Sequence, residues 1–278
     1  MIEATVGILH PGSMGAAVAA CAATNAAAVL WCQAERSPAS ATRAERAGLT
    51  PVPTMRELLD RSDIVISLCP PAAAEEVARD VAKHGFTGVY VEANAISPQR
   101  AAHIAELLRP AVVVDGAVIG SPPVHGKTPM LYLSGPPAAT TRLEKLFAGT
   151  AVRTKPLDEE VGQASALKAA YTAFQKASRV LAALATGMAR EYGVDQELIE
   201  VASKRNTSYL AEPGYIAKTA SRAWRWGPEL EEAADTLAAA GLPPEMLRAA
   251  ASTLGRWDDV KDDGKLTLTD ALDRLAQP

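Results

Sequence analysis

The first fifteen residues constrain the fold of this chain more than any other segment. A short β-type run at 5–9 (TVGIL) leads into a glycine-containing turn at 10–15 (HPGSMG), and small helix-forming residues follow at 16–20. A turn of this kind between a strand and a helix offers free backbone N–H groups and the positive end of a helix dipole to an anion. The segment therefore predicts a phosphate-binding turn close to the N-terminus.

The turn matches the dinucleotide-binding pattern G-x-G-x-x-G at its second and third glycines, while His10 stands in place of the first. Gly12 would let the backbone approach the phosphates, and Gly15 would let the helix pack closely on the strand. An ordinary strand–turn–helix connection is the alternative. The residues expected to hold the pyrophosphate are Pro11, Gly12, Ser13, Met14 and Gly15.

Composition is that of a globular enzyme with a sizeable core. The chain has 278 residues, is 48% hydrophobic and carries a net charge of −4. Its length favours two domains, and its charge gives no basic footprint for nucleic acid or an anionic membrane. The cysteines lack metal-type spacing, and the acidic segment 259–270 is interpreted as an exposed turn, so no metal site is expected. Without a leader-type segment, the cytoplasm is the expected compartment.

The two parts of the chain have different patterns. Up to residue 158, apolar β-type runs at 28–32, 63–68, 88–92, 111–115 and 130–135 alternate with helical segments. This alternation predicts an α/β fold with a mostly parallel sheet covered on both faces. Beyond residue 158 the β-type runs vanish, and a long helix is expected over 160–192. We therefore predict a dinucleotide-binding domain at 1–158, of the Rossmann type, and an all-α substrate and dimerisation domain at 159–278.

The residues that follow the second strand bear on the choice of dinucleotide. Arg36 and Ser37, with Arg43 nearby, favour the 2′-phosphate of NADP. Glu35 leaves NAD open, because an acidic residue at this strand end can bind the ribose hydroxyls. A solvated loop that touches no cofactor is the remaining alternative.

Two later strand ends also point to the cofactor edge. Cys69 and Pro70 begin a rigid turn after the strand at 63–68, and Asn94 follows the strand at 88–92. Ser97 precedes Pro98 and is interpreted as a helix cap. Asn94 has no such local role in the sequence, so we expect it to contact nicotinamide or substrate.

These motifs together resemble the β-hydroxyacid dehydrogenase superfamily, which includes 6-phosphogluconate and 3-hydroxyisobutyrate dehydrogenases. The resemblance covers the turn at 10–15, the proline turn at 69–71, the segment ending in Ser97-Pro98, and two further motifs. It implies NAD(P)-dependent oxidation or reduction of a small substrate. The family's carboxylate-binding segment falls on 115–121, where Ile119 replaces the serine, so Gly120 and Ser121 are the expected substrate contacts.

The family's catalytic segment resembles residues 162–172, with Lys168 at the lysine position and Tyr171 and Thr172 in place of two asparagines. Lys168 is also the only charge in an apolar helical stretch. A lysine whose pKa is lowered by burial can donate or accept the hydroxyl proton near neutral pH. Snorkelling to solvent is the alternative. Tyr171, three residues on, shares its helical face and is expected with Thr172 to reach the substrate.

We therefore interpret the chain as an NADP-dependent oxidoreductase acting on a small hydroxy acid, keto acid or related carbonyl compound. An imine reductase of similar fold and a non-catalytic dinucleotide-binding protein are the alternatives. A homodimer built through the helical domain is expected, because that domain is rich in alanine and the resemblance implies dimers. Trp224 and Trp226 are interpreted as packing, with a substrate wall or a dimer contact left open.

Overall fold

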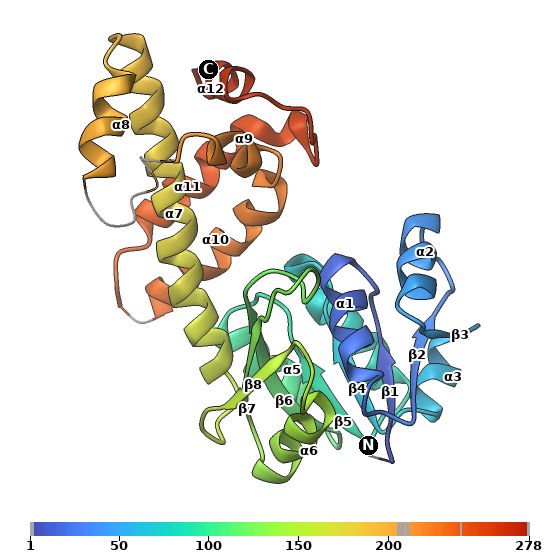
Figure 1. Cartoon of the computed structure of the whole chain (residues 1–278). Helices are drawn as coiled ribbons and strands as arrows, with labels where there is room; N and C mark the ends of the chain where they lie inside the picture. Colours follow the sequence, from blue (N-terminus) through green and yellow to red (C-terminus); the bar gives the residue numbers. More distant parts are fainter. Residues whose placement is uncertain (1–2, 205–208, 210–211, 240, 277–278) are drawn as a thin grey trace. The chain divides into compact units, whose positions relative to one another are not determined.

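The computed structural model describes residues 3–204, 209, 212–239 and 241–276. The chain forms two compact units, Met1–Lys168 and Ala169–Pro278 (Figure 1). Sequence analysis placed the boundary after residue 158. The first unit extends to Lys168 because the opening turn of the long helix α7 (Gln163–Glu191) is hydrogen-bonded to two strands of the sheet.

The first unit is built on an eight-stranded sheet with the order β3-β2-β1-β4-β5-β6-β7-β8. Pairing is parallel except between β6 and β7, which are antiparallel. The strands are β1 (Thr5–Ile8), β2 (Ala28–Cys32), β3 (Thr50–Val52), β4 (Ile64–Ser67), β5 (Val89–Glu92), β6 (Val112–Ile119), β7 (Met130–Ser134) and β8 (Arg153–Pro156). The predicted α/β fold class is confirmed.

Both faces of the sheet are covered by helices, as the apolar strands predicted. Side chains alternate along each strand, so that Ile64 and Ile66 of β4 pack on one face and Val65 on the other. One face is covered by α1 (Ser13–Ala22), α2 (Pro38–Arg46) and α6 (Pro137–Phe147). The other is covered by α3 (Met55–Asp60), α4 (Ala74–Lys83) and α5 (Pro98–Leu107), with the short helix η1 (Pro71–Ala73) leading into α4.

The described residues of the second unit form helices joined by turns and loops, with no strand among them. Its elements are the greater part of α7, α8 (Asp195–Ser203), α9 (Tyr215–Ala220), α10 (Ala223–Ala239), α11 (Glu245–Leu254), η3 (Gly255–Val260) and α12 (Leu268–Ala276). Trp257 is fully buried in its core and donates its indole N–H to the Ala271 carbonyl at 2.8 Å. Because buried indole groups need such a partner, this bond fixes α12 against η3.

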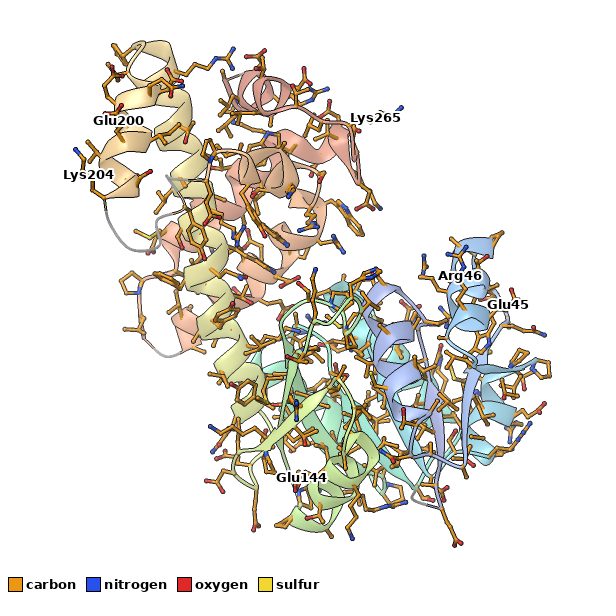
Figure 2. The ribbon with its side chains drawn as sticks, in the orientation of Figure 1. Glu45, Arg46, Glu144, Glu200, Lys204 and Lys265 are labelled. Atoms are coloured by element: carbon orange, nitrogen blue, oxygen red, sulfur yellow. The ribbon has the colours of Figure 1, made fainter. Side chains whose placement is uncertain are left out.

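Charged side chains lie mainly on the outside of both units. Glu45 and Arg46 of α2 and Lys265 before α12 are exposed (Figure 2). In the part of the chain that the structure describes, no helix has the length and apolar character needed to cross a membrane.

Candidate functional site

The predicted phosphate-binding turn connects β1 to α1, and Gly12 is the residue that precedes the helix. A Cβ added to Gly12 would have no atom within 4 Å, so the backbone there is open to a ligand. A Cβ added to Gly15 would collide with the backbone oxygen of His10. Gly12 therefore leaves room for phosphate, and Gly15 allows the turn to fold back onto the helix. Pro11, Ser13 and Met14 complete the turn and the first residues of α1.

Two arginines lie beside this turn. Arg43 of α2 donates its Nε–H to the Pro11 carbonyl at 3.1 Å and its Nη2 group to the Ser40 hydroxyl at 3.1 Å. It thereby joins the phosphate-binding turn to the start of α2. Ser37 is the N-cap of α2, and its hydroxyl accepts from the Ser40 amide at 3.3 Å. The local role of Ser37 is therefore to cap the helix.

Arg36 is the second arginine beside the turn, and its side chain is suited to binding a phosphate. Its Nε is buried and has no hydrogen-bond partner among the described residues, and the same holds for His10 Nδ1. Burial, with a smaller effect of the Arg36 charge, lowers the pKa of His10 to about 4, so His10 is neutral at physiological pH. An orphaned guanidinium nitrogen close to a helix N-terminus suits the 2′-phosphate of NADP, which supplies acceptors and negative charge.

The ends of β4 and β5 are joined through Asn94. Its Oδ1 accepts from the Cys69 amide at 2.5 Å, and its Nδ2 group donates to the Ser67 hydroxyl at 3.0 Å. The expectation that Asn94 has no local role is wrong, because both ends of its buried amide are engaged. Asn94 therefore fixes the turn at Cys69 and Pro70, and Pro70 is exposed after the end of β4. Contact of Asn94 with nicotinamide or substrate stays a prediction.

Two carboxyl groups lie side by side on β5 and β6. Glu92, the last residue of β5, is opposite Asp115 of β6 in the parallel register, and both are completely buried. Burial raises the pKa of Glu92 to about 8 and also raises the pKa of Asp115. Glu92 accepts from the Asn94 amide through Oε1, whereas its buried Oε2 has no partner within the described part of the chain. Near neutral pH the pair therefore holds a proton, which resides mainly on Glu92.

Asp115 anchors the first turn of α7. Its carboxylate accepts from the amides of Gly162 and Ser165 at 3.0 and 2.8 Å, from the Ser165 hydroxyl at 2.7 Å, and from Ser134. A carboxylate at a helix N-terminus satisfies free N–H groups and interacts favourably with the helix dipole. The start of α7 is consequently fixed to β6, and the bond from the Ala164 amide to Ser134 fixes it to β7.

Lys168 lies one turn after Ser165 on the same helix and is half-buried. Burial lowers its pKa to about 8, and the nearby charge of Asp115, with that of Glu92 when Glu92 is ionised, partly offsets that effect. An ammonium group with this pKa exists in both protonation states close to neutral pH. It can therefore donate or accept a proton, which is the role predicted from the sequence.

The predicted substrate residues fall in both units. Gly120 and Ser121 follow β6 in the first unit, and Gly120 has a φ of +126°, a conformation that favours glycine. Tyr171 and Thr172 are the third and fourth residues of the second unit. Tyr171 is 44% exposed and its hydroxyl accepts from Gln175, whereas Thr172 is buried. The substrate roles of these four residues stay predictions.

Sequence reasoning did not identify Glu92 as part of the site, and it used Asp115 only as the start of a family motif. A signal was present, because each is an acidic residue within or at the end of an apolar β-type run. A charge in such a position is buried when the strand is central, and buried charges are seldom found without a partner.

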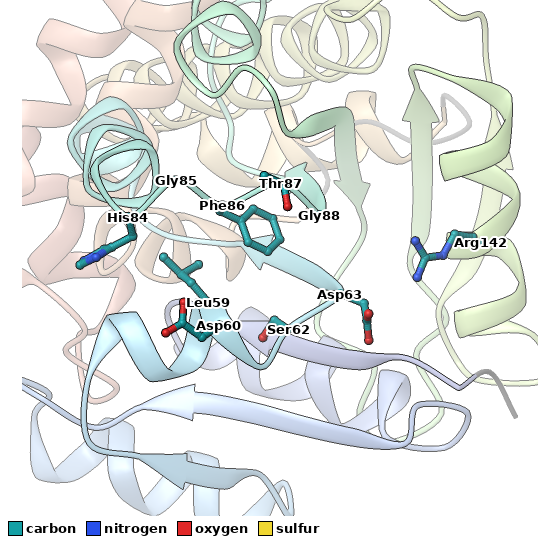
Figure 3. A pocket seen from close by; sticks show the side chains of 10 residues that line it. All are labelled: Leu59, Asp60, Ser62, Asp63, His84, Gly85, Phe86, Thr87, Gly88 and Arg142. Carbon is teal, nitrogen blue, oxygen red and sulfur yellow. The ribbon is translucent and has the colours of Figure 1, made fainter.

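A separate hollow lies at the other end of the strands, where β4 and β5 begin (Figure 3). Its volume is about 390 Å³, and Asp60, Asp63, His84 and Arg142 are among the residues that line it. Ligands of open α/β sheets bind outside the carboxyl ends of the strands. This hollow is therefore distinct from the candidate site.

Comparison with known proteins agrees with this geometry. Residues 5–91 match the family described as NADP oxidoreductase, coenzyme F420-dependent, and residues 189–257 match a domain of unknown function, DUF1932. A 28.5 kDa protein from the 7S RNA 5′ region of Methanothermus fervidus, named as uncharacterized, is 28% identical over 173 residues. The match covers 62% of this chain and 66% of that protein, so it spans just under two thirds of the curated relative.

Solved structures share the fold along the whole chain. The 3-hydroxyisobutyrate dehydrogenase of Mycobacterium tuberculosis has a TM-score of 0.78 at 18% identity, covering 99% of this chain and 100% of that one. This likeness shows that the chain shares the fold of a 3-hydroxyisobutyrate dehydrogenase. A reductive aminase from Aspergillus terreus, solved with NADPH, has a TM-score of 0.57 at 18% identity, covering 98% and 99% of the two chains. The resemblance predicted from the motifs is confirmed.

The buried carboxyl group of Glu92 makes the stability of this protein depend on pH. Because the folded pKa of Glu92 is about 8 and its ordinary value is 4.5, the folded protein keeps a proton that the unfolded chain releases. The stabilisation is therefore complete below the ordinary value and is lost as the pH rises toward 8, by at most about 1.4 kcal/mol per pH unit. We expect Glu92→Gln to remove this dependence, as measured by urea unfolding at several pH values.

The exposed residue Glu106 of α5 provides the control for this experiment. Glu106→Gln should retain the pH dependence of the wild-type protein. The titration of Lys168 does not mask the effect, because its lowered pKa adds stability only as the pH rises above about 8. An unchanged slope in Glu92→Gln would show that Glu92 is ionised at neutral pH.

Proposed function

We propose that the protein is an NADP-dependent oxidoreductase that interconverts a small hydroxy acid and the corresponding keto acid, or a related carbonyl compound. The observation that carries the proposal is Lys168, whose pKa is lowered to about 8 and whose helix is fixed to the sheet by Asp115. Oxidation of an alcohol needs a group that accepts the hydroxyl proton, and reduction needs a donor to the developing alkoxide. Lys168 is suited to both directions.

Different residues of the first unit are proposed to bind the cofactor, to position the proton-transfer group and to bind the substrate. Gly12 and the start of α1 would hold the pyrophosphate, and Arg36 would hold the 2′-phosphate. NADP(H), when bound, supplies or accepts the hydride. Asp115 fixes the start of the helix that carries Lys168, and its charge limits the fall in the pKa of Lys168. Gly120 and Ser121 are proposed to bind the substrate carboxylate.

The choice of NADP over NAD is tested at Arg36. We expect Arg36→Ala to weaken NADPH binding by roughly ten- to hundredfold, because a charge-assisted contact to phosphate is worth about 1.5–3 kcal/mol. NADH affinity should change little, since NADH lacks the 2′-phosphate. Fluorescence titration of both nucleotides measures the two dissociation constants, with Arg56→Ala on α3 as the control. Equal weakening of both nucleotides would refute the proposed specificity.

Imine reduction is the second candidate reaction, because the reductive aminase fold covers nearly the whole chain. A screen of hydroxy acids, keto acids and cyclic imines with NADPH and with NADP⁺ separates the two reactions. We expect turnover of acids rather than imines, since Lys168 stands at the catalytic position. Turnover of imines alone would favour the second reaction. Tight nucleotide binding with no turnover of any compound would favour a non-catalytic dinucleotide-binding protein.

We also propose that the protein is a homodimer in which the helical unit forms the interface. Exposed apolar residues of that unit include Phe174, which is 73% exposed, and Leu181, which is 52% exposed, both on α7. Burying such residues in a partner would stabilise a dimer. We expect light scattering at micromolar concentration to give the mass of two chains, and the mass of one chain would refute the proposal.

A further inference from the structure

We propose that Arg179 forms a binding site for a small oxyanion within the helical unit. Its guanidinium group is enclosed by three aromatic rings, at 4.6 Å from the ring centre of Tyr209, 4.3 Å from that of Tyr215 and 5.8 Å from that of Trp226. We call this arrangement the aromatic cage. Arg179 comes from α7, Tyr215 from α9 and Trp226 from α10.

Two nitrogen atoms of the guanidinium group in the cage lack acceptors among the described residues. Its Nε and Nη1 atoms are buried and have no hydrogen-bond partner in the described part of the chain. Arginine keeps its charge at all physiological pH values and brings five N–H donors. Aromatic faces attract the cation but do not accept its in-plane N–H groups as a carboxylate does. The missing partner is therefore an in-plane acceptor with negative charge.

Neighbouring charges do not supply that partner. Glu229 of α10 forms an ion pair with Lys176, which lies one turn before Arg179 on α7. Lys176 is also 5.5 Å from the Trp226 ring centre, and Lys218 is 5.3 Å from that of Tyr215. Glu229 thus neutralises Lys176, and Lys218 is the second positive charge beside the cage. An added anion would be drawn to it by this excess of positive charge.

The geometry selects the chemical class of the ligand. A guanidinium group directs its N–H donors within its own plane, where carboxylate, phosphate and phosphonate oxygens fit them. The rings around it offer contact to a short apolar group attached to the anion. The ligand is therefore a small organic or inorganic oxyanion. This inference does not depend on the proposed oxidoreductase activity, because it concerns residues of the helical unit alone.

The test is calorimetric titration of the full-length protein, without nucleotide, with sodium phosphate and separately with sodium isobutyrate. Ionic strength is held constant with sodium chloride. We expect saturable binding of at least one probe, and Arg179→Met should weaken it by roughly ten- to hundredfold. Arg190→Met is the matched control, since Arg190 lies on the same helix but pairs with Asp273 on the surface. It should bind as the wild type does.

A second variant keeps the test decisive if Arg179→Met fails to fold. Tyr215→Leu keeps the guanidinium and removes one wall of the cage, so it should weaken the same probe several-fold. Binding of isobutyrate alone would assign a carboxylate ligand, binding of phosphate alone would assign a phosphate or phosphonate, and binding of both would assign a general oxyanion site. Absence of saturable binding to the wild type, or equal binding by the wild type and either cage variant, would overturn the proposal. NADPH titration of the same samples tests the first unit separately.

Discussion

Replacement of Lys168 by alanine should lower turnover by about 10²–10⁴, which is the usual contribution of a positioned general acid or base. The affinity for NADPH should stay close to that of the wild type, because the proposed phosphate contacts are on the β1–α1 turn and near α2. Lys168→Arg should not restore activity, since a guanidinium group does not release a proton near neutral pH. Steady-state kinetics on the substrate found by the screen, with nucleotide titration, measures both effects.

The control for this experiment is Lys155→Ala, which removes an exposed lysine from the edge strand β8. That variant should retain wild-type turnover. The wild-type pH profile should also show an ionisation near 8, reflecting the lowered pKa of Lys168. Near-normal turnover by Lys168→Ala would refute the proposed mechanism, and Tyr171, on the same helical face, would then be the next residue to test.

Replacement of Asp115 by alanine should lower the free energy of unfolding by about 3–5 kcal/mol, because it leaves buried donors unsatisfied. The Asp115 carboxylate accepts hydrogen bonds from two backbone N–H groups and the Ser165 hydroxyl at the start of α7, and from the Ser134 hydroxyl of β7. Its loss should release the first turn of this helix from the sheet. The midpoint of urea unfolding, followed by circular dichroism, measures the effect.

Two variants calibrate this expectation. Ser165→Ala removes one hydroxyl and leaves the Ser165 amide bonded to Asp115, so a loss of about 1 kcal/mol is expected. Asp80→Ala breaks an exposed ion pair with Lys83 and should cost less than about 1 kcal/mol. If Asp115→Ala were no more destabilising than Asp80→Ala, the start of α7 would not depend on the sheet for its position.

Local patterns in the sequence determined the fold class and several strand positions. The run at 28–32 forms β2 with the predicted bounds, because a continuous apolar strand between two helical segments suits the centre of a parallel sheet. Two edge strands were not predicted. β3 contains Pro51, and β8 consists of Arg153, Thr154, Lys155 and Pro156. Prolines and charges are tolerated at sheet edges, where strands carry little of the apolar signal that sequence reasoning uses.

The sequence also determined the positions of the phosphate-binding turn and of Lys168, because each belongs to a short motif with fixed spacing. Their partners were decided by the tertiary structure alone. Glu92 and Asp115 become neighbours through strand pairing across 23 positions of the chain, and Arg43 reaches Pro11 from α2, the second helix of the chain. Asn94 forms hydrogen bonds with Ser67 and Cys69, and helix α4 and strand β5 lie between these residues and Asn94 in the sequence. Periodicity identifies which residues share a face of one element, but packing between elements decides which charges and amides meet.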